Sequence, residues 1–359
     1  MKKAPVAVFD HLNEWKSLNP GLGPIRDALA SLQHPHHAYR HVTVGGTNGK
    51  GTLAFNLMKQ LPGKVGLFCS PHLVDIRERI TINGNFVADR VWQEAYAFLS
   101  QKIDPRTLSY FELMLLTAVV VFQREAVDWA VFEVGLGGRW DAVNALAPEL
   151  MVLTNVSLDH TRILGDTVEA IALVKIDIAR TGKPFILPAS IYNYPSVKTR
   201  LLEIKPLIKT YSDKGTIEDN LTCYNRLCYF LPIQPLSELA LPLGRKMKVS
   251  QNLYVDASHN RAGWQSTVLW LQKHHPSPIR MLCNLSADRN VGEFVSIFKN
   301  ISADMVVLPG DYEKVYRGVW PETVRFGDWN DLSTLMQEPV LVTGSLYFVG
   351  EFLRRFPTI

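Results

Sequence analysis

The sequence lacks three features that would assign it to a specialised class of protein. Its 359 residues contain only four cysteines, at positions 69, 223, 228 and 283, and these match neither CxxC metal spacing nor a secreted disulfide scaffold. The longest apolar stretch, residues 113–122, is too short to cross a bilayer of about 30 Å. No dense run of Lys or Arg accompanies the formal net charge of +4, so nucleic acid is not an expected partner.

These absences indicate a cytoplasmic protein. The cysteines are then free thiols in a reducing compartment. The N-terminal segment reaches Asp10, His11 and Asn13 before an apolar segment builds up, which argues against a signal peptide. We therefore expect a cytoplasmic monomer without a membrane or nucleic-acid partner.

Short β-branched runs alternate with helix-compatible stretches, as is typical of parallel α/β domains. The chain exceeds the length that one hydrophobic core usually supports, which favours two domains. The pattern weakens between about residues 190 and 243 and then resumes. We expect an ATP-binding domain over residues 1–190, a shortened linker region over 191–243 and a smaller Rossmann-like α/β domain over 244–359. Predicted strands cover residues 41–44, 65–69, 129–134, 151–156, 184–187, 253–256, 281–284, 305–308 and 340–343.

A glycine-rich loop lies between the first predicted strand and a helix-compatible run. Its sequence is Gly45-Gly46-Thr47-Asn48-Gly49-Lys50-Gly51-Thr52. In this context backbone N–H groups and a helix N-terminus can hold phosphate. The Walker spacing is not met, because Val44 stands where the first glycine should be and Gly51 stands where Ser or Thr is expected. The hydroxyl that normally helps hold Mg²⁺ is therefore missing after Lys50.

Other oxygen and nitrogen ligands for the metal are expected at neighbouring strand ends, because open α/β sheets bind ligands there. Ser70, Glu133 and His160 are the candidates. A carboxylate in the apolar run 129–134 is costly unless it is paired or metal-bound. Glu133 could instead form an ion pair with an arginine, and His160 could be a core or capping histidine.

Several motifs together resemble the folylpolyglutamate synthase/dihydrofolate synthase family of the Mur ligase superfamily. The resemblance is dense over residues 40–185 and thinner over 243–359. It implies a P-loop, Mur-ligase-like central domain with a parallel sheet and a smaller α/β C-terminal domain. The motifs are residues 46–52, Ser70-Pro71-His72-Leu73 with Glu78-Arg79-Ile80, Tyr110-Phe111-Glu112, residues 133–139 with Asp141 and Asn144, Leu158-Asp159-His160-Thr161 with Leu164-Gly165, Asp256-Ala257-Ser258-His259-Asn260, and residues 344–350.

The resemblance implies an ATP-dependent ligase. ATP would phosphorylate a pteroate or folate carboxylate, and the amine of L-glutamate would attack the acyl phosphate to give an amide. The loop residues that would hold ATP are Gly46, Thr47, Asn48, Gly49, Lys50, Gly51 and Thr52. Ser70, Glu133 and His160 would bind two Mg²⁺ ions.

Lys175 falls at the lysine that this family carboxylates with CO₂ to a carbamate. A carbamate turns a cation into an anion able to bind magnesium, and we expect Lys175 to act as both a metal ligand and a catalytic residue. Without the resemblance, Lys175 would be interpreted as a surface lysine on an amphipathic helix.

The remaining site residues also follow from the resemblance. In the second domain, Arg245 and Asp256 would contact ATP, with His259 as a catalytic residue and Asn260 as a further nucleotide contact. Phe68, His72 and Arg79 would contact the pterin substrate. The alternative for the second-domain group is a set of solvated surface charges.

Three histidines, His34, His36 and His37, have no acidic or cysteine partner nearby in the sequence, and we interpret them as loop residues. The family's His-Gln-x-x-Asn-Ala helix has no clear counterpart. Residues 218–221 are the candidate remnant.

Three alternatives to a bifunctional dihydrofolate synthase/folylpolyglutamate synthase stay open. One is dihydrofolate synthase activity alone. Another is a diverged nucleotide-binding protein without ligase activity, which the short middle region suggests. A cell-wall Mur ligase is disfavoured, because Gly51 follows the lysine and the loop of Ser70 and His72 is of the folate type.

Overall fold

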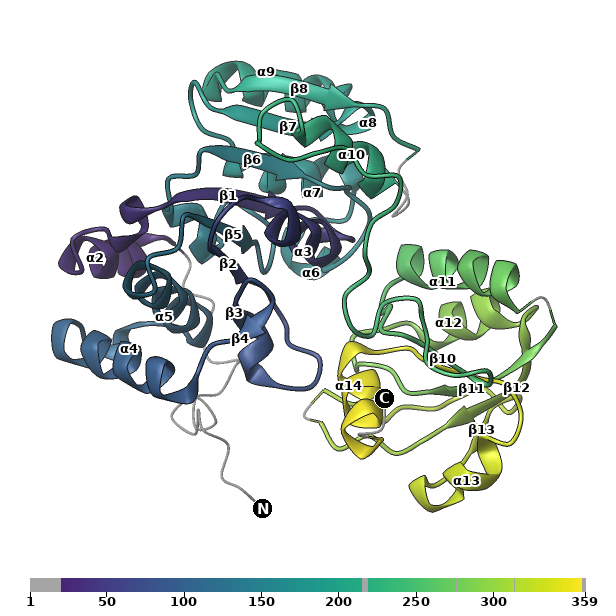
Figure 1. Ribbon diagram of the computed structural model, residues 1–359. Coiled ribbons are helices and arrows are strands. Elements are labelled where there is room, and N and C mark those ends of the chain that lie inside the picture. The colour runs from purple at the N-terminus through teal and green to yellow at the C-terminus, as the bar shows by residue number, and fades with distance from the viewer. Residues whose placement is uncertain (1–20, 215–218, 276, 313, 357–359) are drawn as a thin grey trace. The chain divides into compact units, whose positions relative to one another are not determined.

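The chain forms two compact α/β units (Figure 1). The computed structural model describes residues 21–214, 219–275, 277–312 and 314–356. Of these, residues 21–72, 76–214 and 219–240 belong to the first unit, and residues 73–75 with the rest belong to the second. None of the helices in these ranges combines the length and apolar character needed to cross a membrane.

The first unit is built on an eight-stranded sheet with the order β4-β3-β2-β5-β1-β6-β7-β8. The strands from β2 to β8 in this order are parallel, whereas β3 and β4 form an antiparallel edge. Every residue of β2, β5 and β6 is buried, which explains their continuous apolar sequences. The strands are β1 Arg40–Gly45, β2 Val65–Phe68, β3 Ile80–Ile82, β4 Asn85–Phe86, β5 Trp129–Glu133, β6 Leu150–Leu153, β7 Pro184–Pro188 and β8 Leu207–Tyr211.

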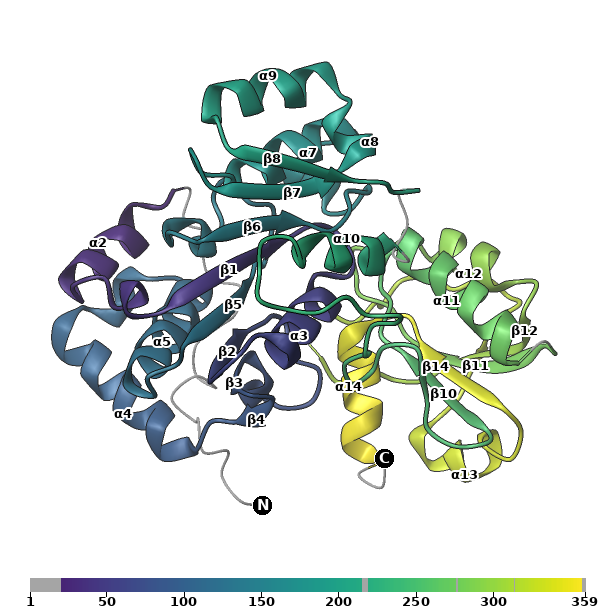
Figure 2. The ribbon, with the colours of Figure 1, turned by 45° about the horizontal axis from the view of Figure 1, so that its top comes forward.

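Helices cover both faces of this sheet (Figure 2). Helices α2, α4, α5 and α7 pack on one face, and α3 and α10 pack on the other. Helix α5 begins with a capping box in which Ser109 and Glu112 satisfy each other's backbone N–H groups. The helices are α2 Gly23–Ser31, η1 Pro35–Ala38, α3 Lys50–Gln60, η2 Ile76–Arg79, α4 Asp89–Lys102, η3 Pro105–Thr107, α5 Tyr110–Arg124, η4 Ala142–Ala145, α6 Thr161–Leu164, α7 Val168–Lys175, η5 Ile176–Ile178, α8 Ala189–Tyr192, α9 Pro195–Ile204 and α10 Asn220–Leu227.

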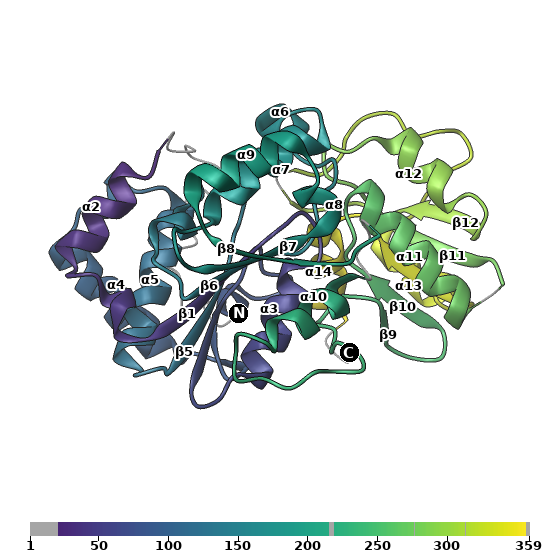
Figure 3. The same cartoon turned by 90° about the horizontal axis from the view of Figure 1, so that it is seen from above.

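The second unit has a six-stranded sheet with the order β13-β12-β11-β14-β10-β9, in which β9 alone is antiparallel to its neighbour. Helices α11 and α12 cover one face of this sheet, and α13 and α14 cover the other (Figure 3). Leu253 and Val255 pack with α13 and α14, whereas Tyr254 packs with α11 and α12. The elements are β9 Met247–Lys248, β10 Leu253–Asp256, α11 Arg261–His274, β11 Ile279–Cys283, α12 Val291–Phe298, β12 Ser302–Val307, β13 Arg325–Phe326, η7 Trp329–Asp331, α13 Leu332–Leu335, β14 Val340–Thr343 and α14 Leu346–Arg355.

The segment 191–243, expected to be a linker, is instead largely part of the first unit. It supplies the end of α8, then α9, β8 and α10, and residues up to 240 cluster with that unit. Strand β8 pairs with β7 in parallel over five residues. Its burial pattern alternates between exposed and partly buried positions, as is usual for an edge strand, so it lacks the apolar run by which the inner strands were predicted.

Candidate functional site

The glycine-rich loop connects the C-terminal end of β1 with α3, as the sequence predicts. Gly46 and Gly49 adopt positive φ angles of 138° and 80°. A Cβ on Gly46 would lie 1.9 Å from Oγ1 of Thr154, so the loop backbone passes directly against the end of β6. The first amides of α3 have no partner within the helix and are available to an anion.

The segment that follows β6 holds the loop in place. Thr154 Oγ1 donates to the carbonyl of Asn48 at 2.8 Å, and Asn48 N donates to Asn155 Oδ1 at 3.0 Å. Ser157 N donates to Thr47 Oγ1 at 3.1 Å. Sequence reasoning missed these supporting residues. Their only signal is a polar Thr-Asn-x-Ser run directly after a buried strand.

A further supporting residue comes from α10. Asn220 Nδ2 donates to the carbonyl of Gly49 at 3.2 Å, and Asn220 is 4% exposed. The candidate remnant over residues 218–221 therefore contributes a contact to the phosphate-binding loop. Glu218 lies outside the described residues.

Glu133 lies beside the residue that follows the loop lysine. It ends β5 and is 5% exposed. A Cβ added to Gly51 would lie 3.5 Å from Glu133 Oε2, and the backbone N of Ser70 donates to that oxygen at 3.3 Å. The structure thus brings a carboxylate next to the position where the Walker pattern has a hydroxyl. The Nζ atom of Lys50 donates to the carbonyl of Thr47 at 3.3 Å.

Lys175 is buried, unlike a surface lysine on an amphipathic helix. Its Nζ donates to the carbonyl of Gly46 at 2.8 Å, and the residue is 4% exposed. Burial, reinforced by the nearby charge of Lys50, lowers the pKa of Lys175 to about 7. A Cβ on Gly138 would lie 2.7 Å from the carbonyl oxygen of Lys175, so the glycine cluster after β5 packs directly on this lysine.

His160 immediately precedes α6 and has a left-handed backbone with φ of 49°. Its Nε2 lies 3.9 Å from Asp159 Oδ1, and its side chain is 39% exposed. The Asp159 carboxylate opposes the lowering of the pKa of Lys175.

The three predicted pterin contacts occupy different environments. Arg79 Nε donates to His72 Nδ1 at 2.9 Å, and the Arg79 guanidinium lies 5.5 Å from the centre of the Tyr110 ring. Phe68 is fully buried and its ring packs 5.6 Å from that of Phe111. A ligand therefore cannot touch Phe68 in this conformation, although Phe68 supports the partly buried Phe111.

The second unit gathers its predicted residues at the C-terminal end of β10. Asp256 is 3% exposed; its burial raises the pKa of the carboxyl, and Arg245 opposes that shift. Arg245 Nη1 donates to the Ala257 carbonyl at 3.2 Å, and His259 Nδ1 lies 3.2 Å from the same oxygen. Asn260 Oδ1 accepts a hydrogen bond at 3.0 Å from the backbone N of the third residue of α11. Asn260 is therefore the N-cap of that helix.

Comparison with known proteins agrees with the motif resemblance. The chain is 36% identical over 178 residues to the dihydrofolate synthase/folylpolyglutamate synthase of Haemophilus influenzae, a match covering 49% of the chain and 40% of that protein. It is 26% identical over 391 residues to the folylpolyglutamate synthase of Lacticaseibacillus casei, a match covering 90% and 91% of the two chains. The chain is thus similar to dihydrofolate synthase/folylpolyglutamate synthases over about half its length, and to a folylpolyglutamate synthase at lower identity over most of it.

A solved structure has the same fold as this chain. The bifunctional folylpolyglutamate synthase/dihydrofolate synthase of Yersinia pestis, complexed with AMPPNP and a manganese ion, superposes with a TM-score of 0.83. The superposition covers 98% of this chain and 97% of that one, at 22% identity. No family model matches the chain. The match to the Haemophilus relative spans about two fifths of its length, so the stronger family likeness is confined to part of the protein.

Proposed function

We propose that the chain is an ATP-dependent ligase that joins a pteroate or folate carboxylate to L-glutamate through an acyl phosphate. The observation that carries this proposal is the Glu133 carboxylate beside Gly51, next to a loop whose amides and Lys50 are arranged for phosphate. The likeness to these relatives supports it, because the relatives are named for this ligation.

The residues around Gly51 fit a divalent metal. The site offers the Glu133 carboxylate and the Ser70 hydroxyl group, and a buried Lys175 with a lowered pKa close to the loop. Magnesium prefers hard oxygen ligands, and a carbamate on Lys175 would supply two more. We propose that Ser70, Glu133, His160 and carboxylated Lys175 hold two Mg²⁺ ions, which when bound neutralise charge on the transferring phosphoryl group.

The low pKa of Lys175 supports its carboxylation. Only the neutral amine attacks CO₂, and a lysine with a pKa of about 7 is about half neutral at pH 7. Attack forms an N–C bond at Nζ and releases one proton, leaving an anionic carbamate. The product relieves the unfavourable burial of a cation next to Lys50.

In the proposed reaction, Lys50 and the loop amides hold the phosphates of ATP. A carboxylate oxygen of the pteroate or folate forms a bond to the γ-phosphorus while the bond to ADP breaks. The glutamate nitrogen then attacks the acyl carbon, the C–N bond forms, and phosphate leaves as the nitrogen loses a proton. We propose that His72 and Arg79 contact the pterin, that Phe68 acts through Phe111, and that Arg245, Asp256, His259 and Asn260 contribute nucleotide and catalytic contacts from the second unit.

The test measures phosphate release from ATP and Mg²⁺ that depends on L-glutamate, with dihydropteroate and with tetrahydrofolate as alternative acceptors. Activity with both acceptors indicates the bifunctional enzyme, and activity with dihydropteroate alone indicates dihydrofolate synthase. Lys50→Ala and Glu133→Gln should each lower kcat by roughly 100-fold or more, since each removes charge stabilisation of the transferring group.

Matched controls are available in the first unit. Lys59→Ala changes an exposed lysine in the last turn of the same helix as Lys50, and Glu149→Gln changes an exposed glutamate. Both controls should retain full activity. Purified protein that is inactive with both acceptors over a range of Mg²⁺ concentrations would refute the ligase proposal in favour of a nucleotide-binding protein.

A further inference from the structure

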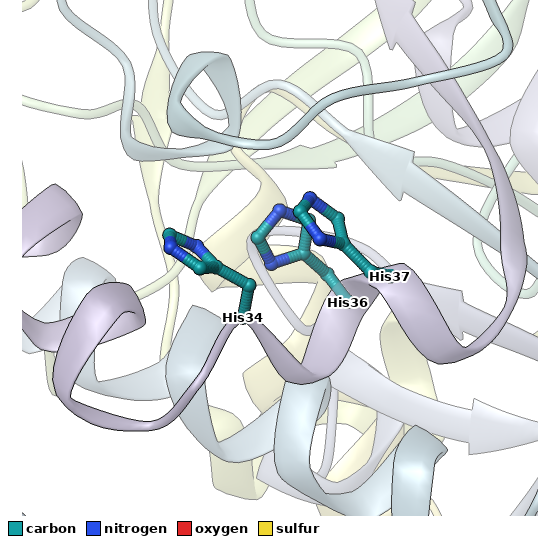
Figure 4. Close-up of side chains that lie close together, drawn as sticks. All are labelled: His34, His36 and His37. Carbon is teal, nitrogen blue, oxygen red and sulfur yellow. The ribbon is translucent and has the colours of Figure 1, made fainter.

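The three histidines interpreted from sequence as loop residues form a compact cluster in the first unit. His36 and His37 belong to η1, and His34 immediately precedes it. Their rings project to the same side of this short helix and lie close to one another (Figure 4). Ring centroids are 4.3 Å apart for His36 and His37, 5.2 Å for His34 and His37, and 5.7 Å for His34 and His36.

We infer that His34, His36 and His37 form a binding site for a divalent transition metal of the zinc type. One ring nitrogen from each histidine can be chosen so that all three lie within 4.8 Å of one another. Three imidazoles suit zinc, cobalt, nickel or copper, whereas magnesium and calcium prefer oxygen. Within the described residues, no other group of three His, Cys, Asp or Glu side chains meets the same distance test.

Unsatisfied buried nitrogen atoms supply a second, independent argument. His36 is 2% exposed, and its Nδ1 is buried without a hydrogen-bond partner. His41, also 2% exposed, has a buried Nε2 without a partner, and its ring lies 6.1 Å from that of His36. Buried polar side-chain atoms are nearly always satisfied, and a bound ion is a recognised reason for an exception.

Metal binding would require the ring nitrogens to move closer together, and two of the three side chains are exposed. Tetrahedral zinc with Zn–N bonds of about 2.0–2.1 Å needs its ligand nitrogens roughly 3.3–3.4 Å apart, so the present separations must shorten. His34 and His37 are exposed and can rotate towards the buried His36.

This site is separate from the proposed magnesium site. The histidines precede the N-terminal end of β1, whereas the phosphate-binding loop follows its C-terminal end. A six-residue strand separates the two by roughly 20 Å. A metal at the histidines would therefore fasten the connection between α2 and β1, which makes its expected role structural.

The experiment uses the full chain without an affinity tag, after bound metal has been removed. Co²⁺ is titrated in while its absorption is recorded, and Zn²⁺ is then added to displace the Co²⁺. Excess Mg²⁺ is present throughout to occupy oxygen sites. We expect one equivalent of Co²⁺ with the absorption of nitrogen-ligated tetrahedral cobalt, and a rise in Tm when Zn²⁺ is added. In His34→Ala/His37→Ala the affinity should fall by at least about 100-fold, and the Tm rise should disappear.

The control removes two histidines that are adjacent in the sequence but lie outside the cluster. His274→Ala/His275→Ala changes exposed or partly exposed residues at the end of α11 in the second unit and should leave both readouts unchanged. The inference is wrong if the wild-type chain does not bind Co²⁺ stoichiometrically, if Mg²⁺ displaces the bound ion, or if His34→Ala/His37→Ala binds as tightly as the wild type. His36→Ala should also abolish binding, and the exposed pair decides the outcome if that buried variant does not fold. Ligase activity is not a readout, so this result stands apart from the proposed function.

Discussion

Replacing Lys175 by methionine should make the protein more stable at neutral pH while abolishing the proposed ligase activity. Burial lowers the pKa of Lys175 in the folded state to about 7, compared with 10.5 for an ordinary lysine. Between these values the unfolded chain binds a proton that the folded chain does not. The free energy of unfolding is therefore not reduced by Lys175 above about pH 10.5. The reduction grows as the pH drops towards 7 and changes little below that value.

The magnitude follows from the two pKa values. Keeping Lys175 buried costs about 4 kcal/mol at pH 7 and about 2 kcal/mol at pH 9. Methionine removes this cost but leaves the carbonyl of Gly46 without its donor, a loss of about 1–3 kcal/mol. Lys175→Met should therefore gain about 1–3 kcal/mol at pH 7, and that advantage should shrink by about 2 kcal/mol by pH 9.

The assay is urea unfolding in buffer free of CO₂, at several values between pH 6 and 9. Hydrogen exchange of peptides from β1 and β5 reports the first unit alone, because a two-unit chain need not unfold in one step. Lys102→Met, at an exposed position in the last turn of α4, is the control and should show no such pH dependence. A stability difference for Lys175→Met that stays constant from pH 7 to 9 would refute the reasoning.

Two further predictions concern glycines that pack against the site. Gly49→Ala should raise the KM for ATP by tenfold or more, because the new Cβ would lie 1.8 Å from Asn220 Nδ2. A strained left-handed residue together with a displaced Asn220 costs on the order of 1–3 kcal/mol. Gly182→Ala is the matched control in steady-state kinetics, since Gly182 also has a positive φ, 68°, but nothing lies within 4 Å of a Cβ added there. Equal effects of the two substitutions on the KM for ATP would contradict the role of the loop. Gly138→Ala should raise the Mg²⁺ concentration needed for half-maximal activity, because the new Cβ would lie 2.7 Å from the carbonyl oxygen of Lys175 and would move the backbone of that proposed ligand. An unchanged Mg²⁺ titration would show that this packing does not position the lysine.

Much of the fold could be predicted because local sequence carries it. The inner strands β5 and β6 are apolar on successive residues since both faces are covered, and the predicted strands over 129–134 and 151–156 overlap them. Strands β3, β4, β8, β9 and β13 were missed, because β8 largely alternates in burial and the other four span only two or three residues. The assignment of residues 191–240 to the first unit depends on the pairing of β8 with β7, a contact that leaves no local signal.

For the site, the sequence alone determined which chemical groups are present: a loop lysine followed by Gly51, a carboxylate at Glu133, and motifs of a folate ligase family. Only the tertiary structure decided which of these groups meet. It buried Lys175 against Gly46, put Asn220 on the loop carbonyl of Gly49, and gathered three histidines that sequence spacing describes as loop. The reason is physical: residue type and local spacing fix chemistry and secondary structure, whereas burial, pKa and mutual distance arise only when segments far apart in the chain pack together.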